Sequence, residues 1–256
     1  MPAPTYPDDL VPPEDRIFVG RGDFKAIGTE FLRAFVELGG LGPDHHVLDV
    51  GCGIGRMAVP LTGYLGAAGR YEGFDIVADG IEWCNENIAA RHPRFGFRLV
   101  DLFNKRYNPG GSIQPRTFVF PYADSAFDFA FATSVFTHML PEDVEHYMDE
   151  IHRVLRPGGR TLVTFFLLND ESRGLIASGR SRLTFAHEFG VCRVQRKDVP
   201  EAVVAYPEEL ITRLFEQHGF ESTEVHHGGW CGRETFTSQQ DIVVATKRER
   251  REQSDE

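Results

Sequence analysis

The residues best suited to chemistry lie in the run 47–56, which reads VLDVGCGIGR. A short apolar stretch contains one carboxylate, Asp49. Glycines then occupy every second position, at Gly51, Gly53 and Gly55. Glycine lets a backbone turn sharply and lets a ligand approach closely, and the start of a helix presents free N–H groups. This order predicts a buried strand, a tight turn and a helix that together hold a nucleotide-type cofactor.

The spacing of the glycines distinguishes between cofactors. Dinucleotide-binding turns have the pattern G-x-G-x-x-G, in which helix N–H groups receive a pyrophosphate. The pattern here is D-x-G-x-G-x-G, and its acid suits a ligand with an amino group and a cation better than one with two phosphates. The pattern resembles motif I of the class I S-adenosylmethionine-dependent methyltransferases, although a glycine-rich turn without a ligand is the alternative. The resemblance implies that the cofactor is S-adenosylmethionine and that it is bound by Asp49, Gly51, Cys52, Gly53, Gly55 and Arg56.

Two further acids follow predicted strands. Asp75 lies 20 positions after Gly55 and ends the predicted strand 71–75, where a carboxylate can accept hydrogen bonds from both ribose hydroxyls. Ile76 would then pack against the adenine. The alternative is that Asp75 only caps the next helix. After the predicted strand 95–100, the resemblance implies that Asp101 and Leu102 meet the adenine, with the acid near its amino group.

A nearly continuous apolar strand is predicted at 127–133, and it leads into Ser134, Val135, Phe136 and His138. Ligands of open parallel sheets bind beyond the carboxyl ends of the strands, where the strand order reverses. Ser134 and Val135 are therefore expected beside the cofactor. His138 is the candidate general base, because a histidine has a reference pKa of about 6.5. Its alternative role is packing near the cofactor.

The acceptor-binding residues are less well defined. The irregular segment 167–206 follows the fifth strand and predicts a substrate lid. Phe136, His187 and Trp230 are candidate acceptor contacts, since aromatic rings can stack on a planar acceptor. The alternative for these aromatic residues is a place in the core. No metal is expected, because the acids after Pro141 fit the first turn of a helix.

The strand and helix pattern predicts one doubly wound, Rossmann-like α/β domain. Its seven-stranded sheet is expected to be mostly parallel, with an antiparallel last strand at 241–246. Residues 1–15 contain five prolines and predict an irregular leader. The methyltransferase-like domain is predicted to span 16–246, and a charged tail follows at 247–256.

Composition excludes several classes of partner. The formal net charge of −11 disfavours a nucleic acid partner. No apolar run approaches about 18 residues and no signal peptide is recognisable, so neither membrane insertion nor secretion is expected. The four cysteines form no C-x-x-C pair, which is consistent with reduced thiols in a cytoplasmic protein.

These observations favour methyl transfer from S-adenosylmethionine to a small-molecule acceptor, most simply to a hydroxyl oxygen. An amine acceptor, for example on an amino sugar, is the nearest alternative. A nicotinamide-dependent oxidoreductase and a cofactor-binding protein without catalysis are alternatives from other classes. The sequence leaves open the acceptor, the pathway, the oligomeric state and whether His138 is a base or a packing residue.

Overall fold

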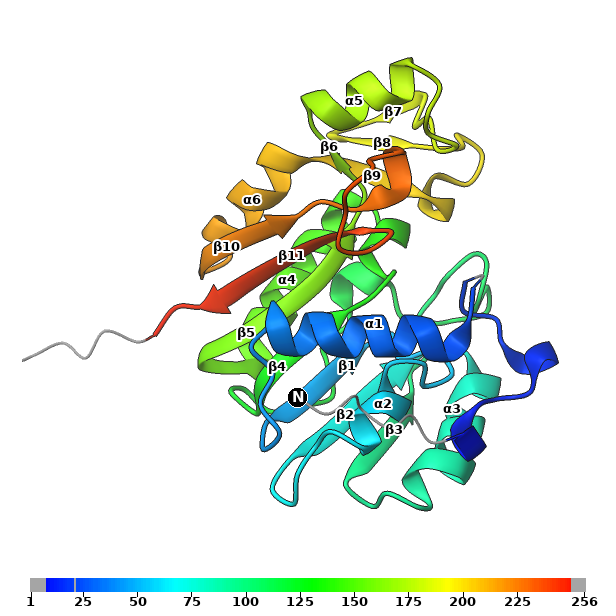
Figure 1. The fold of residues 1–256 in the computed structure, drawn as a ribbon, viewed down its shortest axis with the longest axis vertical. Coiled ribbons are helices and arrows are strands. Elements are labelled where there is room, and N and C mark those ends of the chain that lie inside the picture. The colour runs from blue at the N-terminus through cyan, green and yellow to red at the C-terminus, as the bar shows by residue number, and fades with distance from the viewer. Residues whose placement is uncertain (1–7, 21, 250–256) are drawn as a thin grey trace, which may run out of the picture.

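A twisted sheet of seven strands runs through the molecule (Figure 1), in the order β10-β11-β5-β4-β1-β2-β3. The computed structural model describes residues 8–20 and 22–249. The strands are β1 (His46–Val50), β2 (Arg70–Asp75), β3 (Phe95–Leu99), β4 (Phe127–Ala132), β5 (Leu155–Phe165), β10 (Phe220–His226) and β11 (Asp241–Lys247). Only β11 runs antiparallel to its neighbours, β5 and β10. The predicted fold class is therefore confirmed, and the strand order reverses between β1 and β4.

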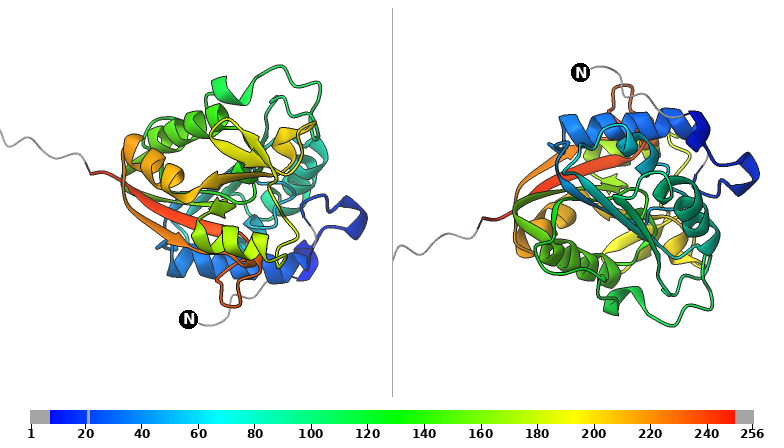
Figure 2. Two further views of the ribbon diagram at one scale, coloured as in Figure 1. Left: turned by 90° about the horizontal axis from the view of Figure 1, so that it is seen from above. Right: turned by 90° about the horizontal axis from the view of Figure 1, so that it is seen from below.

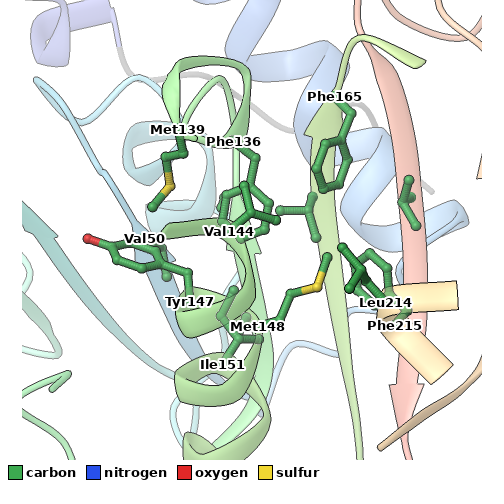
Figure 3. Packing of buried hydrophobic residues seen from close by; sticks show 14 of the residues in the cluster. Val50, Phe136, Met139, Val144, Tyr147, Met148, Ile151, Phe165, Leu214 and Phe215 are labelled. Carbon is green, nitrogen blue, oxygen red and sulfur yellow. The ribbon is translucent and has the colours of Figure 1, made fainter. Parts of the chain in front are cut away.

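Helices cover both faces of the sheet, as the two views in Figure 2 show. One apolar cluster joins the sheet to α1 (Phe24–Glu37), α2 (Ala58–Thr62) and α3 (Ala78–Cys84). The other joins it to α4 (Pro141–Val154) and α6 (Glu208–Gln217), and Figure 3 shows part of this packing. The helix predicted after the glycines is short, because only five residues form α2, which is followed by Gly63 as its C-cap.

Strand β1 shows how the sheet places one acid. Side chains alternate between the two faces of a strand. Leu48 and Val50 pack in the cluster on the α4 side, whereas Val47 packs in the cluster on the α1 side. Asp49 therefore points to the side of α1, although it is fully buried.

The segment 167–206 is ordered, which corrects the expectation of an irregular lid. Its strands form a second sheet in the order β6-β9-β8-β7. The elements are β6 (Leu167–Leu168), α5 (Asp170–Ala177), β7 (His187–Phe189), β8 (Cys192–Val194) and β9 (Val204–Pro207). Strands of two to four residues are too short to show a period in the sequence, which explains the wrong prediction.

A buried carboxylate fastens this second sheet to the main one. Asp241, the first residue of β11, accepts hydrogen bonds of 2.7 Å from the backbone N–H groups of Gly228 and Leu167. It also accepts one of 2.6 Å from the Trp230 indole, and the Arg233 guanidinium lies 3.3 Å away. The 167–206 segment is thus held by polar contacts as well as by its own apolar cluster.

The chain ends lie partly outside the described residues. Of the predicted leader, residues 1–7 are not described, and residues 8–15 include short 3-10 turns at Asp8–Leu10 and Glu14–Arg16. Leu10 is buried, so this part of the leader packs on the domain. Of the predicted tail, residues 250–256 lie outside the described range.

The cluster under α1 gives a direct test of the fold. Phe35 is fully buried and its ring stacks on Phe131 with centroids 4.2 Å apart. Phe35→Ala should lower the free energy of unfolding by about 3–5 kcal/mol in chemical denaturation, because it leaves a cavity. Leu99→Ala is the control, since Leu99 is 54% exposed and its loss should change stability by less than about 0.5 kcal/mol. Equal effects of the two changes would contradict this packing.

Candidate active site

A cavity of about 720 Å³ opens beyond the carboxyl ends of β1, β2 and β4. Its position matches the crevice expected where the strand order reverses. Its volume lies within the range of small-molecule sites. Most of the sequence-predicted cofactor residues line it, namely Asp49, Gly51, Cys52, Gly53, Arg56, Asp75, Ile76, Leu102, Ser134 and Val135.

The turn at residues 51–55, here called the glycine turn, needs glycine for its backbone shape. Gly51, Gly53 and Gly55 have φ angles of 80°, 57° and 78°, a region that other residues rarely adopt. A Cβ at Gly51 would lie 2.5 Å from a methyl group of Val135, and one at Gly55 would lie 2.7 Å from Ile88. Gly55 does not line the cavity, so its predicted cofactor contact is replaced by packing against the helix that follows β2.

Asp49 has one carboxylate oxygen without a partner. Its Oδ2 accepts a hydrogen bond of 2.6 Å from the Tyr71 hydroxyl, whereas its buried Oδ1 has none. Burial and, to a smaller extent, nearby Asp75 raise the pKa of Asp49 to about 8, against the effect of the Tyr71 hydrogen bond. A buried, unpaired acid that lines a cavity is stabilised by a cation. The site therefore fits a ligand with an ammonium group, such as the amino-acid end of S-adenosylmethionine.

Asp75 joins the end of β2 to the glycine turn. Its Oδ2 accepts a hydrogen bond of 2.7 Å from the Gly53 N–H, and its Oδ1 accepts one of 2.9 Å from the Val77 N–H. The second contact is a local turn before α3, whose N-cap residue, Val77, has no side-chain cap. Each carboxylate oxygen keeps a further lone pair, so both can still accept from hydroxyls in the cavity. The ribose contact stays a prediction that this geometry permits.

Asp101 is turned away from the cavity. Its carboxylate accepts a hydrogen bond of 2.5 Å from the Ser112 hydroxyl and one of 3.2 Å from the Ser112 N–H. These contacts lower the pKa of Asp101, and the residue is exposed. The predicted adenine contact of Asp101 is therefore not supported, and only its neighbour Leu102 lines the cavity.

Residues 17–20, here called the N-terminal strap, form one wall of the cavity. All four line the cavity, and a Cβ at Gly53 would lie 2.5 Å from Val19. The Arg56 guanidinium donates to the carbonyl groups of Val19 and Gly20 and so holds the strap over the glycine turn. Asp23 caps α1 instead of reaching the cavity, with a hydrogen bond of 2.7 Å from Ala26 N–H.

His138 lines the half of the cavity opposite the glycine turn, here called the acceptor half. It lies at the end of a 3-10 turn formed by Phe136–His138. Burial lowers the pKa of His138, and hydrogen bonds to the backbone of Ala202 and Glu201 oppose that effect. The positive charge of Arg106 lowers the pKa further. The imidazole is therefore neutral at neutral pH, which is the form that can accept a proton.

Tyr147, on α4, also lines the cavity and is absent from the predicted site residues. Its ring packs on Phe136 and Phe120, while its hydroxyl points away from that packing (Figure 3) and lines the cavity. The hydroxyl has no hydrogen bond to any described residue. Burial, with Asp143 and Asp75 nearby, raises the pKa of Tyr147, so the hydroxyl keeps its proton and can donate to a ligand.

The three predicted acceptor contacts do not line the cavity. Phe136 is fully buried and its ring meets Phe165 edge-on, with centroids 5.3 Å apart. Trp230 packs against Phe166 and donates to Asp241. His187 lies in β7, where it pairs with Val194. Phe136 and Trp230 therefore pack among other aromatic side chains, which is the alternative to acceptor binding that the sequence left open.

The described parts of the chain contain no group of three or more His, Cys, Asp or Glu side chains that could hold a metal ion. None of the helices described is long and apolar enough to cross a membrane.

Comparison with known proteins agrees with this geometry. Residues 48–163 match a family model described as a methyltransferase domain. The chain is 32% identical over 121 residues to methyltransferase GfsG of Streptomyces halstedii, covering 46% of this chain and 37% of that protein. It is 29% identical over 128 residues to an O-methyltransferase of Pyrenophora dematioidea, covering 50% and 42%. The chain thus matches about two fifths of the length of these relatives.

The fold is shared with solved structures. A SAM-dependent methyltransferase from Methanosarcina mazei superposes with a TM-score of 0.56 at 21% identity, covering 84% of this chain and 97% of that one. The matched segment 48–163 is thus a methyltransferase domain by sequence, and the solved structure shows that its fold extends over most of the chain.

The unpaired acid predicts proton release on cofactor binding. With a pKa of about 8, Asp49 is mostly protonated at pH 7, and a cation beside it should lower that pKa. S-adenosylmethionine should therefore release about one proton on binding at pH 7, and its affinity should rise with pH up to about 8. Calorimetry in buffers of different ionisation enthalpy measures this proton. Asp49→Asn is the control that should release none, and a wild-type protein that releases none would contradict the assignment.

Proposed function

We propose that this protein transfers a methyl group from S-adenosylmethionine to a small-molecule acceptor, most simply to a hydroxyl oxygen. The observation that carries the proposal is Asp49, a buried acid of the cavity lining at the glycine turn whose Oδ1 has no hydrogen-bond partner. A cavity built for phosphates would present N–H groups without a buried acid beside them.

In this proposal, the residues in the half of the cavity at the glycine turn, here called the cofactor half, bind and orient the cofactor. Asp49 faces the amino group and Asp75 accepts from the ribose hydroxyls, while Ile76 and Leu102 pack on the adenine. The bound cofactor supplies a methyl group on a sulfonium whose departure leaves a neutral thioether. The strap residues Phe18 and Val19 shield this half from water.

The residues of the acceptor half position the nucleophile. Holding two reactants in line can lower a barrier by about 7–11 kcal/mol, so orientation carries most of this chemistry. Neutral His138 can accept the hydroxyl proton, a contribution of about 10²–10⁴-fold. Tyr147 offers a hydroxyl donor that can fix the acceptor.

The neutral protonation state of His138 favours a hydroxyl acceptor over an amine. An amine needs only to be unprotonated, whereas a hydroxyl benefits from a base, and burial keeps His138 neutral. The O-methyltransferase from Pyrenophora dematioidea supports the same choice. An amine acceptor remains the second candidate.

Calorimetry with S-adenosylmethionine and with NAD tests the cofactor. We expect S-adenosylmethionine to bind and NAD to give no response. Tight NAD binding without a response to S-adenosylmethionine would establish the oxidoreductase alternative instead. Binding without turnover across a broad panel of hydroxylated and amino compounds would favour a protein that holds the cofactor without catalysis.

Asp75→Ala should weaken S-adenosylmethionine binding by about ten- to hundredfold, because hydrogen bonds to a charged group contribute about 1.5–3 kcal/mol each. Asp124→Ala is the control. Asp124 is an acid that does not line the cavity and its side chain is 74% exposed, so the dissociation constant should not change. Unchanged affinity in Asp75→Ala would remove the ribose assignment.

With a hydroxylated acceptor that turns over, kcat should rise with pH and level off below about 6.5, because burial lowers the pKa of His138 from that reference value. His138→Ala should lower kcat by about 10²–10⁴-fold and remove this rise. The affinity for S-adenosylhomocysteine should stay as in the wild type. A variant with the wild-type rate and pH profile would show that His138 only packs.

A further inference from the structure

The loop at residues 103–116, here called the basic loop, differs in charge from the rest of the chain. It contains three basic residues and no acid, although the whole chain has a net charge of −11. All three bases, Lys105, Arg106 and Arg116, line the cavity. We propose that the methyl acceptor carries an anionic group, a carboxylate or a phosphate, and that Arg106 is its main contact. This inference rests on the proposed function of the cavity and names the class of its acceptor.

Hydrogen bonds hold the basic loop in place. A β-bridge joins Leu102, just before the loop, to Ile113 within it. The Asp101 carboxylate accepts a hydrogen bond from the Ser112 hydroxyl. At the tip, the Asn104 side-chain oxygen accepts hydrogen bonds of 2.9 Å and 3.0 Å from the N–H groups of Arg106 and Tyr107. The position of Arg106 at the cavity is therefore set by its own loop.

The three bases differ in their partners. Lys105 donates a hydrogen bond of 3.1 Å to the Asp198 carbonyl oxygen. Arg116 lies 3.5 Å from the Glu142 carboxylate. Arg106 lies over the Tyr107 ring, 5.0 Å from its centroid, and no acid of the described residues pairs with it. Its guanidinium thus keeps donors in a planar fork, the geometry that matches a carboxylate or a phosphate.

The charge of Arg106 reaches the candidate base. Burial is the main cause of the lowered pKa of His138, and the positive charge of Arg106 adds to it, while both residues line the same cavity. An anion held by Arg106 would therefore belong to a molecule whose other end lies near His138 and the Tyr147 hydroxyl.

Two acids, Asp143 and Glu201, also line this half of the cavity. Asp143 accepts hydrogen bonds from the backbone at Leu140 and Arg116, and burial raises its pKa. Glu201 comes from the second sheet's side of the cavity. Because Arg116 is paired with Glu142, the donors that remain for an anionic ligand in this half are chiefly those of Arg106.

Matched pairs of neutral and anionic probes test the proposal without a known acceptor. The carboxylate pair is 3,4-dihydroxybenzoate and 3,4-dihydroxybenzamide, and the phosphate pair is phenyl phosphate and phenol. Calorimetry on the full chain, with and without S-adenosylhomocysteine, should show a preference of about tenfold for the anion in at least one pair, the size of one charge-assisted hydrogen bond. A preference in one pair only identifies that anion, and a preference in both assigns the shared chemistry.

Arg106→Gln should remove the preference while leaving the affinity for the neutral probes and for S-adenosylhomocysteine unchanged. Arg98→Gln is the matched control, because Arg98 also lies over a tyrosine ring, at 5.2 Å from Tyr122, but does not line the cavity. That variant should keep the preference. Equal affinity within both pairs, including no measurable binding of any probe, would overturn the proposal, as would a preference that survives Arg106→Gln.

This result is separable from the proposed function. A wild-type protein that does not bind S-adenosylhomocysteine would refute the methyltransferase proposal. The probe pairs, measured on the cofactor-free protein, would still decide whether the cavity selects anions.

Discussion

The structure depends on one constraint, which is that the chain must turn in the left-handed backbone region three times between β1 and α2. Only glycine does this at low cost. The turn is then fixed from outside by Asp75, whose carboxylate binds the Gly53 N–H from the end of the neighbouring strand. The two strands that end at the cavity are thereby locked to each other, and Asp49 is left buried with one oxygen unpartnered. The binding site follows from a backbone geometry and from an acid that the fold leaves without a counter-charge.

Three separate pieces of chain close the cavity around that turn. The N-terminal strap lies over the glycine turn through Arg56, and Phe18 meets Tyr107 of the basic loop with ring centroids 6.5 Å apart. The basic loop in turn contacts the 167–206 segment through Lys105. Gln240 completes the enclosure, since it lines the cavity, accepts from the Ser134 hydroxyl and precedes the buried Asp241. Cofactor and acceptor are thus expected to be enclosed by parts of the chain that contact one another.

The sequence predicted the elements whose patterns are local. The fold class and the antiparallel last strand follow from apolar periodicity, and ten residues of the cavity follow from the glycine spacing, from the positions of the strand ends and from the family resemblance. The errors have a common cause, which is that the direction of a side chain is set by tertiary partners. Asp101 follows its strand as expected, yet Ser112 holds its carboxylate outside the cavity. Phe136 lies in the expected turn, but its ring packs inward on Phe165. Tyr147 fits a core helix face, and nothing in that pattern indicates that its hydroxyl emerges in the cavity.

The central claim is that the glycine turn and its two acids hold an adenosyl amino acid. A crystal structure with S-adenosylhomocysteine bound tests it most directly. The account predicts the amino group of the ligand beside Asp49 and the ribose hydroxyls within hydrogen-bond distance of Asp75. A glycine turn that stays empty in that structure, or that binds phosphates in place of the ligand, would contradict it.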